Sequence, residues 1–280
     1  MTEHFGPIRM IASDMDGTLL RNDGTVSERT AAAIHAAQAR GVLFAVCSGR
    51  YPEYADAPLR AAGIRCLISG NNGVTIWDAA TDTVLSDHAI DPAAARAVRQ
   101  AADRYGLPYI VYGRKTVTAN GPEALRIARG SLGDRLEAEY GVRFDAGEDA
   151  VRAALTAPVN KFYFYDYRLP EDQKESLLRD FAAIPNIAVT SSGMVNAEVI
   201  PAGCDKAGGV VEMARLFGID MRQVMTVGDY ENDVPMLRAA GLGVAMGNSG
   251  DAIKRCAMRV TATNEEDGLA QAIENYVLNR

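Results

Sequence analysis

The sequence predicts an α/β fold: a doubly wound parallel sheet with an inserted α+β domain. Short, continuously apolar runs recur along the chain, as in strands that are buried on both faces of a sheet. Helical patterns separate these runs, which is typical of βα units. The runs cover residues 8–13, 42–47, 66–68, 224–227 and 243–246, and each stops at small or polar residues.

Helix boundaries support the same fold. Ser27 precedes an Ala-rich stretch that reaches Arg40 and is followed by Gly41, so Ser27 is a predicted N-cap and Gly41 a predicted helix end. Asp205 similarly precedes a helical pattern that ends near Gly218. In a doubly wound sheet, ligands bind beyond the carboxyl ends of the strands. The residues that follow the apolar runs are therefore the first candidates for a functional site.

The middle of the chain has a different pattern of predicted secondary structure. Helical stretches there alternate with β-rich pieces such as Tyr109–Tyr112 and the alternating Lys161–Tyr165. We therefore predict a core domain of residues 1–82 and 189–280, and an inserted α/β domain of residues 83–188.

Composition limits the classes of function. The chain has 280 residues, a formal charge of −7 and 48% hydrophobic residues, as in ordinary globular proteins. Negative charge argues against a nucleic-acid partner, since binding to nucleic acid relies on a basic surface. No signal-like start and no apolar run long enough for a membrane span is found, which predicts no membrane partner and a cytoplasmic location. The four cysteines form no C-x-x-C pair and are interpreted as reduced thiols.

Two acidic strings follow predicted strands. Asp14-Met15-Asp16-Gly17-Thr18 places two carboxylates two residues apart, where the chain turns at a glycine. Gly228-Asp229-Tyr230-Glu231-Asn232-Asp233 follows another apolar run. Acidic residues often serve only as helix caps or in loops, and that interpretation stays open for each string alone. Together they also suit Mg²⁺, which takes oxygen ligands and usually keeps waters. Asp14, Asp16 and Asp229 are the predicted metal ligands.

Two further residues are candidates for phosphate binding. Ser48 ends a predicted strand and offers a hydroxyl beside backbone amides. Lys206 lies at a predicted helix start, where its charge opposes the helix dipole. Phosphoryl transfer needs such groups where charge gathers on the phosphate oxygens. A turn serine and a solvated lysine are the ordinary alternatives.

In this order, Asp14-x-Asp16-Gly-Thr, Ser48, Lys206 and Gly228-Asp229-x-x-Asn232-Asp233 resemble the four motifs of the haloacid dehalogenase superfamily of phosphatases. The insertion is similar to the large α/β cap of the Cof-type branch. Ser69-Gly70-Asn71-Asn72-Gly73 resembles the Asn-Gly loop of that branch. The resemblance covers the whole chain, more closely in the core than in the cap, and implies a Rossmann-like core fold.

The resemblance implies a mechanism. Asp14 is the expected nucleophile, which forms an aspartyl phosphate. Asp16 is the expected general acid and base, and its backbone carbonyl joins the shell of Mg²⁺. Ser48, Lys206 and Asn232 form the expected phosphate-binding set and Asp229 is expected to bind the metal, while Asp233 completes the site together with Asn232. Possible contacts near the substrate are Arg50, Asn72 and Asn248.

The predicted reaction is hydrolysis of a small phosphorylated metabolite, such as a sugar phosphate or a phosphorylated cofactor. Two alternatives remain open. A phosphomutase would pass the phosphoryl group to a sugar hydroxyl, and a regulator would bind phosphate or metal without turnover. Retention of Asp16 beside Asp14 argues against the regulator, which needs no acid/base group. The sequence makes no prediction of oligomeric state.

Overall fold

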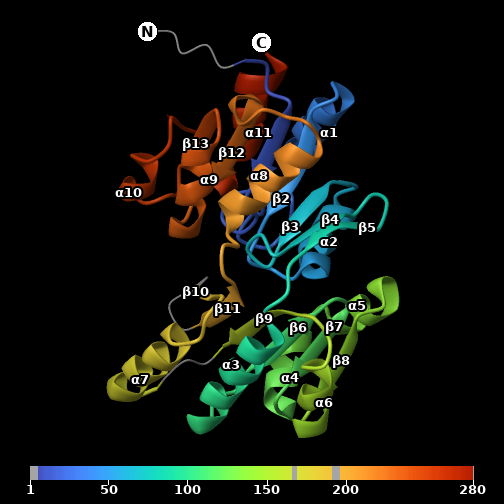
Figure 1. Ribbon diagram of the computed structural model, residues 1–280. Helices are drawn as coiled ribbons and strands as arrows, with labels where there is room; N and C mark the ends of the chain where they lie inside the picture. Colours follow the sequence, from blue (N-terminus) through green and yellow to red (C-terminus); the bar gives the residue numbers. More distant parts are fainter. Residues whose placement is uncertain (1–5, 166–168, 191–195, 280) are drawn as a thin grey trace. The chain divides into compact units, whose positions relative to one another are not determined.

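The computed structural model describes residues 6–165, 169–190 and 196–279, and in it the chain divides into two compact units. Unit 1 consists of residues 1–86 and 205–280, and unit 2 of residues 87–204. In the described ranges, no helix has the length and apolar character that crossing a bilayer requires. Figure 1 shows the elements of each unit.

Unit 1 contains one eight-stranded sheet, in the order β14-β13-β12-β1-β2-β3-β4-β5. The strands are β1 (Met10–Ser13), β2 (Leu43–Cys47), β3 (Leu67–Gly70), β4 (Thr75–Asp78), β5 (Thr83–Asp87), β12 (Val224–Gly228), β13 (Leu242–Ala245) and β14 (Arg259–Val260). All pairings from β14 to β3 are parallel, and β4 pairs antiparallel with β3. The predicted parallel α/β sheet is confirmed, with an antiparallel addition at one edge.

Helices cover this sheet, and two of them begin at the predicted caps. Ser27 Oγ accepts a hydrogen bond from the backbone N–H of Thr30, and Asp205 caps the helix that contains Lys206. The helices of unit 1 are α1 (Glu28–Ala39), α2 (Pro52–Ala61), α8 (Lys206–Leu216), α9 (Val234–Ala239), α10 (Asp251–Lys254) and α11 (Gly268–Ile273). Short helical turns are η1 (Met221–Gln223), η2 (Glu231–Asp233), η3 (Asn264–Glu266) and η4 (Glu274–Leu278).

The core of unit 1 explains why these segments are strands. Met10, Ala12 and Ala45 on one sheet face are fully buried against Val210 and Met213 of α8. The alternate residues Ile11 and Ser13 are buried as well, so β1 is buried on both faces and is apolar up to Ser13. A strand packed on both faces reads as a continuous apolar run. Figure 1 shows α8 lying across the sheet of unit 1.

Unit 2 contains a six-stranded sheet, in the order β10-β11-β9-β6-β7-β8. Its strands are β6 (Ile110–Gly113), β7 (Thr116–Ala119), β8 (Arg143–Ala146), β9 (Val159–Phe164), β10 (Ile187–Thr190) and β11 (Ala197–Pro201). Its helices are α3 (Pro92–Arg104), α4 (Pro122–Arg129), α5 (Gly133–Tyr140), α6 (Glu148–Ala154) and α7 (Glu171–Ala182). Tyr109, Phe162 and Phe164 pack on one face of this sheet against α3 and α7.

The insertion is displaced along the chain from its predicted limits of 83 and 188: unit 2 begins at Asp87 and ends at Cys204. β5 lies beside β4 in the sheet of unit 1, which moves the first boundary. β10 and β11 pair antiparallel with each other, and β11 with β9, so both belong to the second sheet. The apolar character of Val189 indicates a strand, but it does not reveal which sheet that strand joins.

Candidate active site

Three predicted site residues follow three neighbouring strands. β1 lies between β12 and β2, and both pairings are parallel, so their carboxyl ends share one edge of the sheet. Asp14 follows β1, Ser48 follows β2 and Asp229 follows β12. The backbone N–H of Asp14 donates to the carbonyl of Val227 at 2.8 Å, which ties the first acidic string to the strand before the second. The strand order changes direction at β1, where such sheets bind ligands.

Close packing of glycines brings Lys206 to this edge. The carboxylate of Asp205 accepts a hydrogen bond of 2.6 Å from the N–H of Gly208 and so caps α8. The start of α8 lies against the β3–β4 turn: a Cβ atom on Gly73 would be 2.1 Å from the carbonyl oxygen of Asp205. A Cβ atom on Gly209 would be 2.2 Å from Ser69 Oγ. Lys206 is therefore placed by a backbone approach that only glycine allows.

Lys206 bridges two buried carboxylates. Its Nζ atom lies 2.6 Å from Oδ1 of Asp14 and 2.6 Å from Oδ1 of Asp233. The three residues are 3%, 5% and 0% exposed, in the order Lys206, Asp14, Asp233. The other oxygen of Asp233 accepts from the backbone N–H groups of Asp229 and Tyr230. Asp233 thus holds both the ammonium and the loop that carries Asp229.

Burial and the neighbouring charges shift the pKa values of Lys206 and Asp14. Burial lowers the pKa of Lys206, but Asp14 and Asp233 outweigh burial and raise that pKa, so the ammonium stays charged. Burial also raises the pKa of Asp14 well above its usual value, with Asp233 adding to the rise and Lys206 opposing it. The two shifts have different causes: burial dominates for Asp14, whereas the two neighbouring carboxylates dominate for Lys206. Two carboxylates face one ammonium group, so a bound cation would balance the remaining negative charge.

Asp229 is held from three sides. Thr18 Oγ1 donates to Oδ1 of Asp229 at 2.8 Å, and Asn248 Nδ2 lies 3.4 Å from its Oδ2. The same Asn248 amide donates to the carbonyl of Gly17 at 2.9 Å. Gly17 has a φ of +77°, and a Cβ atom there would lie 2.5 Å from Asp229 Oδ2. Burial is the main cause that raises the pKa of Asp229.

Carboxylate oxygens of Asp14, Asp229 and Asp233 all lie within 4.8 Å of one another, a set that suits a hard cation. Each of the three carboxylates could supply a ligand, and Asp233 is the one that also binds both the ammonium of Lys206 and two backbone N–H groups. The carboxylate of Asp16, a predicted ligand, is outside this group. The surplus negative charge and the oxygen donors fit Mg²⁺.

Asp16 pairs instead with Arg50. The guanidinium of Arg50 donates from Nε to Asp16 Oδ2 at 2.9 Å and from Nη2 to Asp16 Oδ1 at 2.5 Å. The hydroxyl oxygen of Ser48 accepts from the backbone N–H of Arg50 at 3.1 Å. The side chains that follow β1 and β2 are therefore connected at the same edge of the sheet.

The remaining predicted residues lie in the loops beside this edge. The N–H of Asn72 donates to the carbonyl of Ser48 at 2.9 Å, and the Asn72 side chain packs on Gly49. Asn232 lies in η2, and its Oδ1 atom is buried without a hydrogen-bond donor among the described residues. That oxygen is available to a further polar group.

Thr18 was not predicted as a site residue. Thr18 lies within the first acidic string and is 2% exposed. Its hydroxyl donates to Asp229, which is 211 positions away in the sequence, and so orients that carboxylate. A hydroxyl directly after the turn glycine of that string was the available signal.

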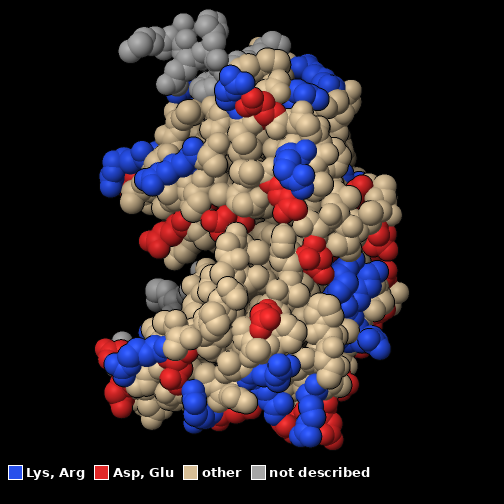
Figure 2. All heavy atoms as spheres, viewed as in Figure 1, with Lys and Arg blue, Asp and Glu red and all other residues tan. Residues whose placement is uncertain are grey.

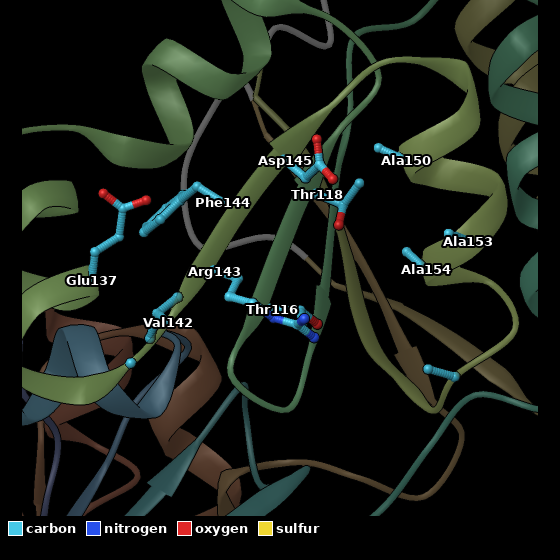
Figure 3. Close-up of a pocket in the computed structure, with 12 residues that line it drawn as sticks. Thr116, Thr118, Glu137, Val142, Arg143, Phe144, Asp145, Ala150, Ala153 and Ala154 are labelled. Carbon is cyan, nitrogen blue, oxygen red and sulfur yellow. The ribbon is translucent and has the colours of Figure 1, made fainter.

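Unit 2 contains a different kind of cavity, of about 660 Å³. Its walls combine strands β7 and β8 with α6, and in Figure 3 Thr118 and Asp145 point toward Ala150, Ala153 and Ala154 of α6. Phe144 lies on the opposite face of β8 in that view. The lining includes none of the ten residues predicted for the site. Figure 2 shows acidic and basic side chains interspersed on the visible face of each unit.

Comparisons with known proteins identify the family of the chain. A family model described as haloacid dehalogenase-like hydrolase matches residues 11–273. The chain is 28% identical over 278 residues to 5-amino-6-(5-phospho-D-ribitylamino)uracil phosphatase YcsE of Bacillus subtilis (strain 168), covering 97% of this chain and 96% of that protein.

Solved structures share the fold. A haloacid dehalogenase-like hydrolase from B. subtilis has a TM-score of 0.80 at 24% identity, with 96% of this chain and 100% of that one covered. A sugar phosphatase of haloacid dehalogenase subclass IIB has a TM-score of 0.75 at 24% identity, with 96% and 98% covered. With the strand-end site described above, the chain belongs to the haloacid dehalogenase-like hydrolases and is a phosphoric monoester hydrolase of that family.

Proposed function

We propose that this chain is a Mg²⁺-dependent phosphatase that hydrolyses phosphomonoesters of small metabolites through an aspartyl phosphate on Asp14. The observation that carries the proposal is the buried contact of Lys206 with Asp14 and Asp233, beside Asp229. A nucleophilic carboxylate, an ammonium group and oxygen ligands for a cation meet at one edge of the sheet. That is the set of groups that phosphoryl transfer uses.

In the first half-reaction, a carboxylate oxygen of Asp14 attacks phosphorus and the bond from phosphorus to the ester oxygen breaks. Asp16 gives its proton to the departing oxygen, so the product leaves as an alcohol. Lys206, Ser48 and the amide NH₂ group of Asn232 would hold the oxygens of the phosphoryl group.

In the second half-reaction, Asp16 takes a proton from water, which attacks phosphorus. The bond between phosphorus and Asp14 breaks, and inorganic phosphate forms. Asp14, Asp229 and the backbone carbonyl of Asp16 would hold Mg²⁺. When bound, the ion supplies positive charge to the phosphoryl oxygens. Asp233 keeps Lys206 and the Asp229 loop in place throughout.

The relative from B. subtilis suggests the first substrate to assay. Its name specifies a phosphate carried on a ribityl chain, which is an alcohol leaving group. Phosphorylated sugar alcohols, sugar phosphates and phosphorylated cofactors form the proposed substrate class.

The test is a panel of these phosphomonoesters, assayed for release of inorganic phosphate with Mg²⁺ or with EDTA. Asp14→Asn is expected to lower turnover by at least about 1,000-fold, because the amide is no nucleophile. Asp251→Asn, an exposed acid at the start of α10, is the matched control. Isomerisation of a hexose phosphate without phosphate release would favour the phosphomutase. Absence of turnover on every ester would favour the regulator.

A further inference from the structure

The contact between Arg50 and Asp16 gives Asp16 a fixed orientation. Nε and Nη2 of Arg50 meet the two carboxylate oxygens separately, at 2.9 and 2.5 Å. In this fork geometry the plane of the carboxylate is set by the plane of the guanidinium. Within the described ranges, no other side chain donates a hydrogen bond to the carboxylate of Asp16.

The backbone of Arg50 is itself fixed. Its N–H donates to Ser48 Oγ at 3.1 Å, and its carbonyl accepts from the N–H of Asn71 at 2.8 Å. A Cβ atom on Gly70 would lie 3.1 Å from that carbonyl oxygen, so the two loops pack in direct contact. Arg50 therefore reaches toward Asp16 from an anchored position at the end of β2.

Asp16 lies on an equally tight turn. The N–H of Leu20 donates to the carbonyl of Met15 at 2.9 Å, and Gly17 takes a left-handed φ of +77°. This turn fixes the backbone of Asp16 but leaves its side-chain torsions free. The Asp16 side chain is 61% exposed, so packing does not hold it. The guanidinium is the group that does.

We infer that Arg50 is the positioning residue of Asp16, and that it aligns the Asp16 carboxyl with the leaving oxygen of the substrate. The inference rests on the function proposed above and assigns Arg50 a role other than contact with the phosphate. A proton carrier displaced by about 1 Å can lose on the order of 100-fold in rate. Because an exposed ion pair adds little to stability, removal of Arg50 tests orientation and leaves the fold intact.

The test compares two substrates that differ in their need for a proton. An alkyl phosphate requires protonation of its leaving oxygen, whereas the nitrophenolate of p-nitrophenyl phosphate leaves unprotonated. The quantity measured is kcat/KM, which includes the steps only up to the departure of the alcohol. Arg50→Ala is expected to lower it by about 10- to 100-fold for the alkyl ester and by less than about 3-fold for the nitrophenyl ester.

Arg50→Lys should restore little of the loss, since an ammonium group cannot form the two-point contact. Asp16→Asn combined with Arg50→Ala should lose no more than Asp16→Asn alone, because both changes act through the same proton transfer. Arg222→Ala is the matched control: Arg222 makes the same fork to Asp220, at 3.0 and 2.6 Å, in η1 and its N-cap.

Three outcomes would overturn the inference. Equal losses for both esters would mean that Arg50 acts on the phosphoryl group. Unchanged kcat/KM would mean that the pair has no role, and a gain would mean that Arg50 restrains Asp16. If Asp16→Asn itself fails to distinguish the two esters, the acid role of Asp16 in the proposed function fails instead. If Asp16→Asn distinguishes them and Arg50→Ala does not, only the role of Arg50 is wrong.

Discussion

Lys206 donates a hydrogen bond of 2.6 Å to Asp14, although 192 positions separate the two residues in the chain. Both are almost completely buried, and the same ammonium contacts Asp233 at 2.6 Å. The contact joins the start of α8 to the end of β1. The same buried contact therefore serves both the candidate site and the packing of α8 against the sheet of unit 1.

Removal of this ammonium should destabilise the protein. Lys206→Met leaves two buried carboxylates without their cation, and breaking a buried pair in this way costs about 3–5 kcal/mol. The free energy of unfolding from urea titrations in EDTA measures the loss. Lys254→Met, at the partly exposed end of α10, should change stability by less than about 0.5 kcal/mol.

A second substitution identifies the cause. Lys206→Met with Asp233→Asn removes one of the two stranded charges, so the double variant should be more stable than Lys206→Met alone. A single Lys206→Met variant as stable as wild type would show that the buried ion pair contributes nothing to the fold.

Apolar runs in the sequence predict those site residues that directly follow a strand. Asp14, Ser48 and Asp229 each follow an apolar run, and parallel strands bring such positions to one edge. Which side chain faces which cannot be read from these patterns. The fork between Arg50 and Asp16 depends on side-chain torsions in two loops.

Non-local pairing limits the prediction of domain boundaries in the same way. Val189 lies in β10, whose sequence is as apolar as a strand of unit 1, yet β10 pairs with β11 in unit 2. The pairing of a strand depends on long-range contacts, so the residues of the strand alone do not predict which sheet it joins.

Mg²⁺ should stabilise the folded protein. A ligand that binds only the native state at 100 times its dissociation constant adds about 2.7 kcal/mol. Thermal unfolding with MgCl₂ and with EDTA should show the rise in Tm for wild type. Asp229→Asn should abolish most of the rise, whereas Asp251→Asn should keep it. An equal response of wild type and Asp229→Asn would exclude Asp229 as a ligand.

Two left-handed glycines offer a matched pair of substitutions. Gly17 and Gly24 have φ values of +77° and +80°. Alanine at either position carries a similar backbone strain of about 1–2 kcal/mol. Only the Cβ atom at position 17 meets another group, at 2.5 Å from Asp229 Oδ2, whereas nothing lies within 4 Å at position 24.

Gly17→Ala should therefore displace the Asp229 carboxylate and reduce both turnover and the Mg²⁺-dependent rise in Tm. Gly24→Ala should lose only stability. Equal turnover in the two variants, measured well below their Tm, would show that the approach of Gly17 to Asp229 has no functional role.

Asp14→Asn should stabilise the metal-free protein at neutral pH while it removes activity. Burial raises the pKa of Asp14 above its ordinary value of 3.8, so ionisation of this carboxyl opposes folding. Wild type then loses stability as the pH rises from below 3.8 through the raised pKa, and the amide has no such loss. It also leaves one ammonium facing one carboxylate.

The expected gain at pH 7.5 in EDTA is about 0.5–2 kcal/mol in the free energy of unfolding, as for other replacements of strained functional groups. At pH 4.5 the difference between Asp14→Asn and wild type should be smaller, because part of the wild-type carboxyl is then protonated. Urea titrations at both pH values measure it. If Asp14→Asn is instead less stable at pH 7.5, attraction to Lys206 outweighs burial, and Asp14 contributes to the fold as well as to the reaction.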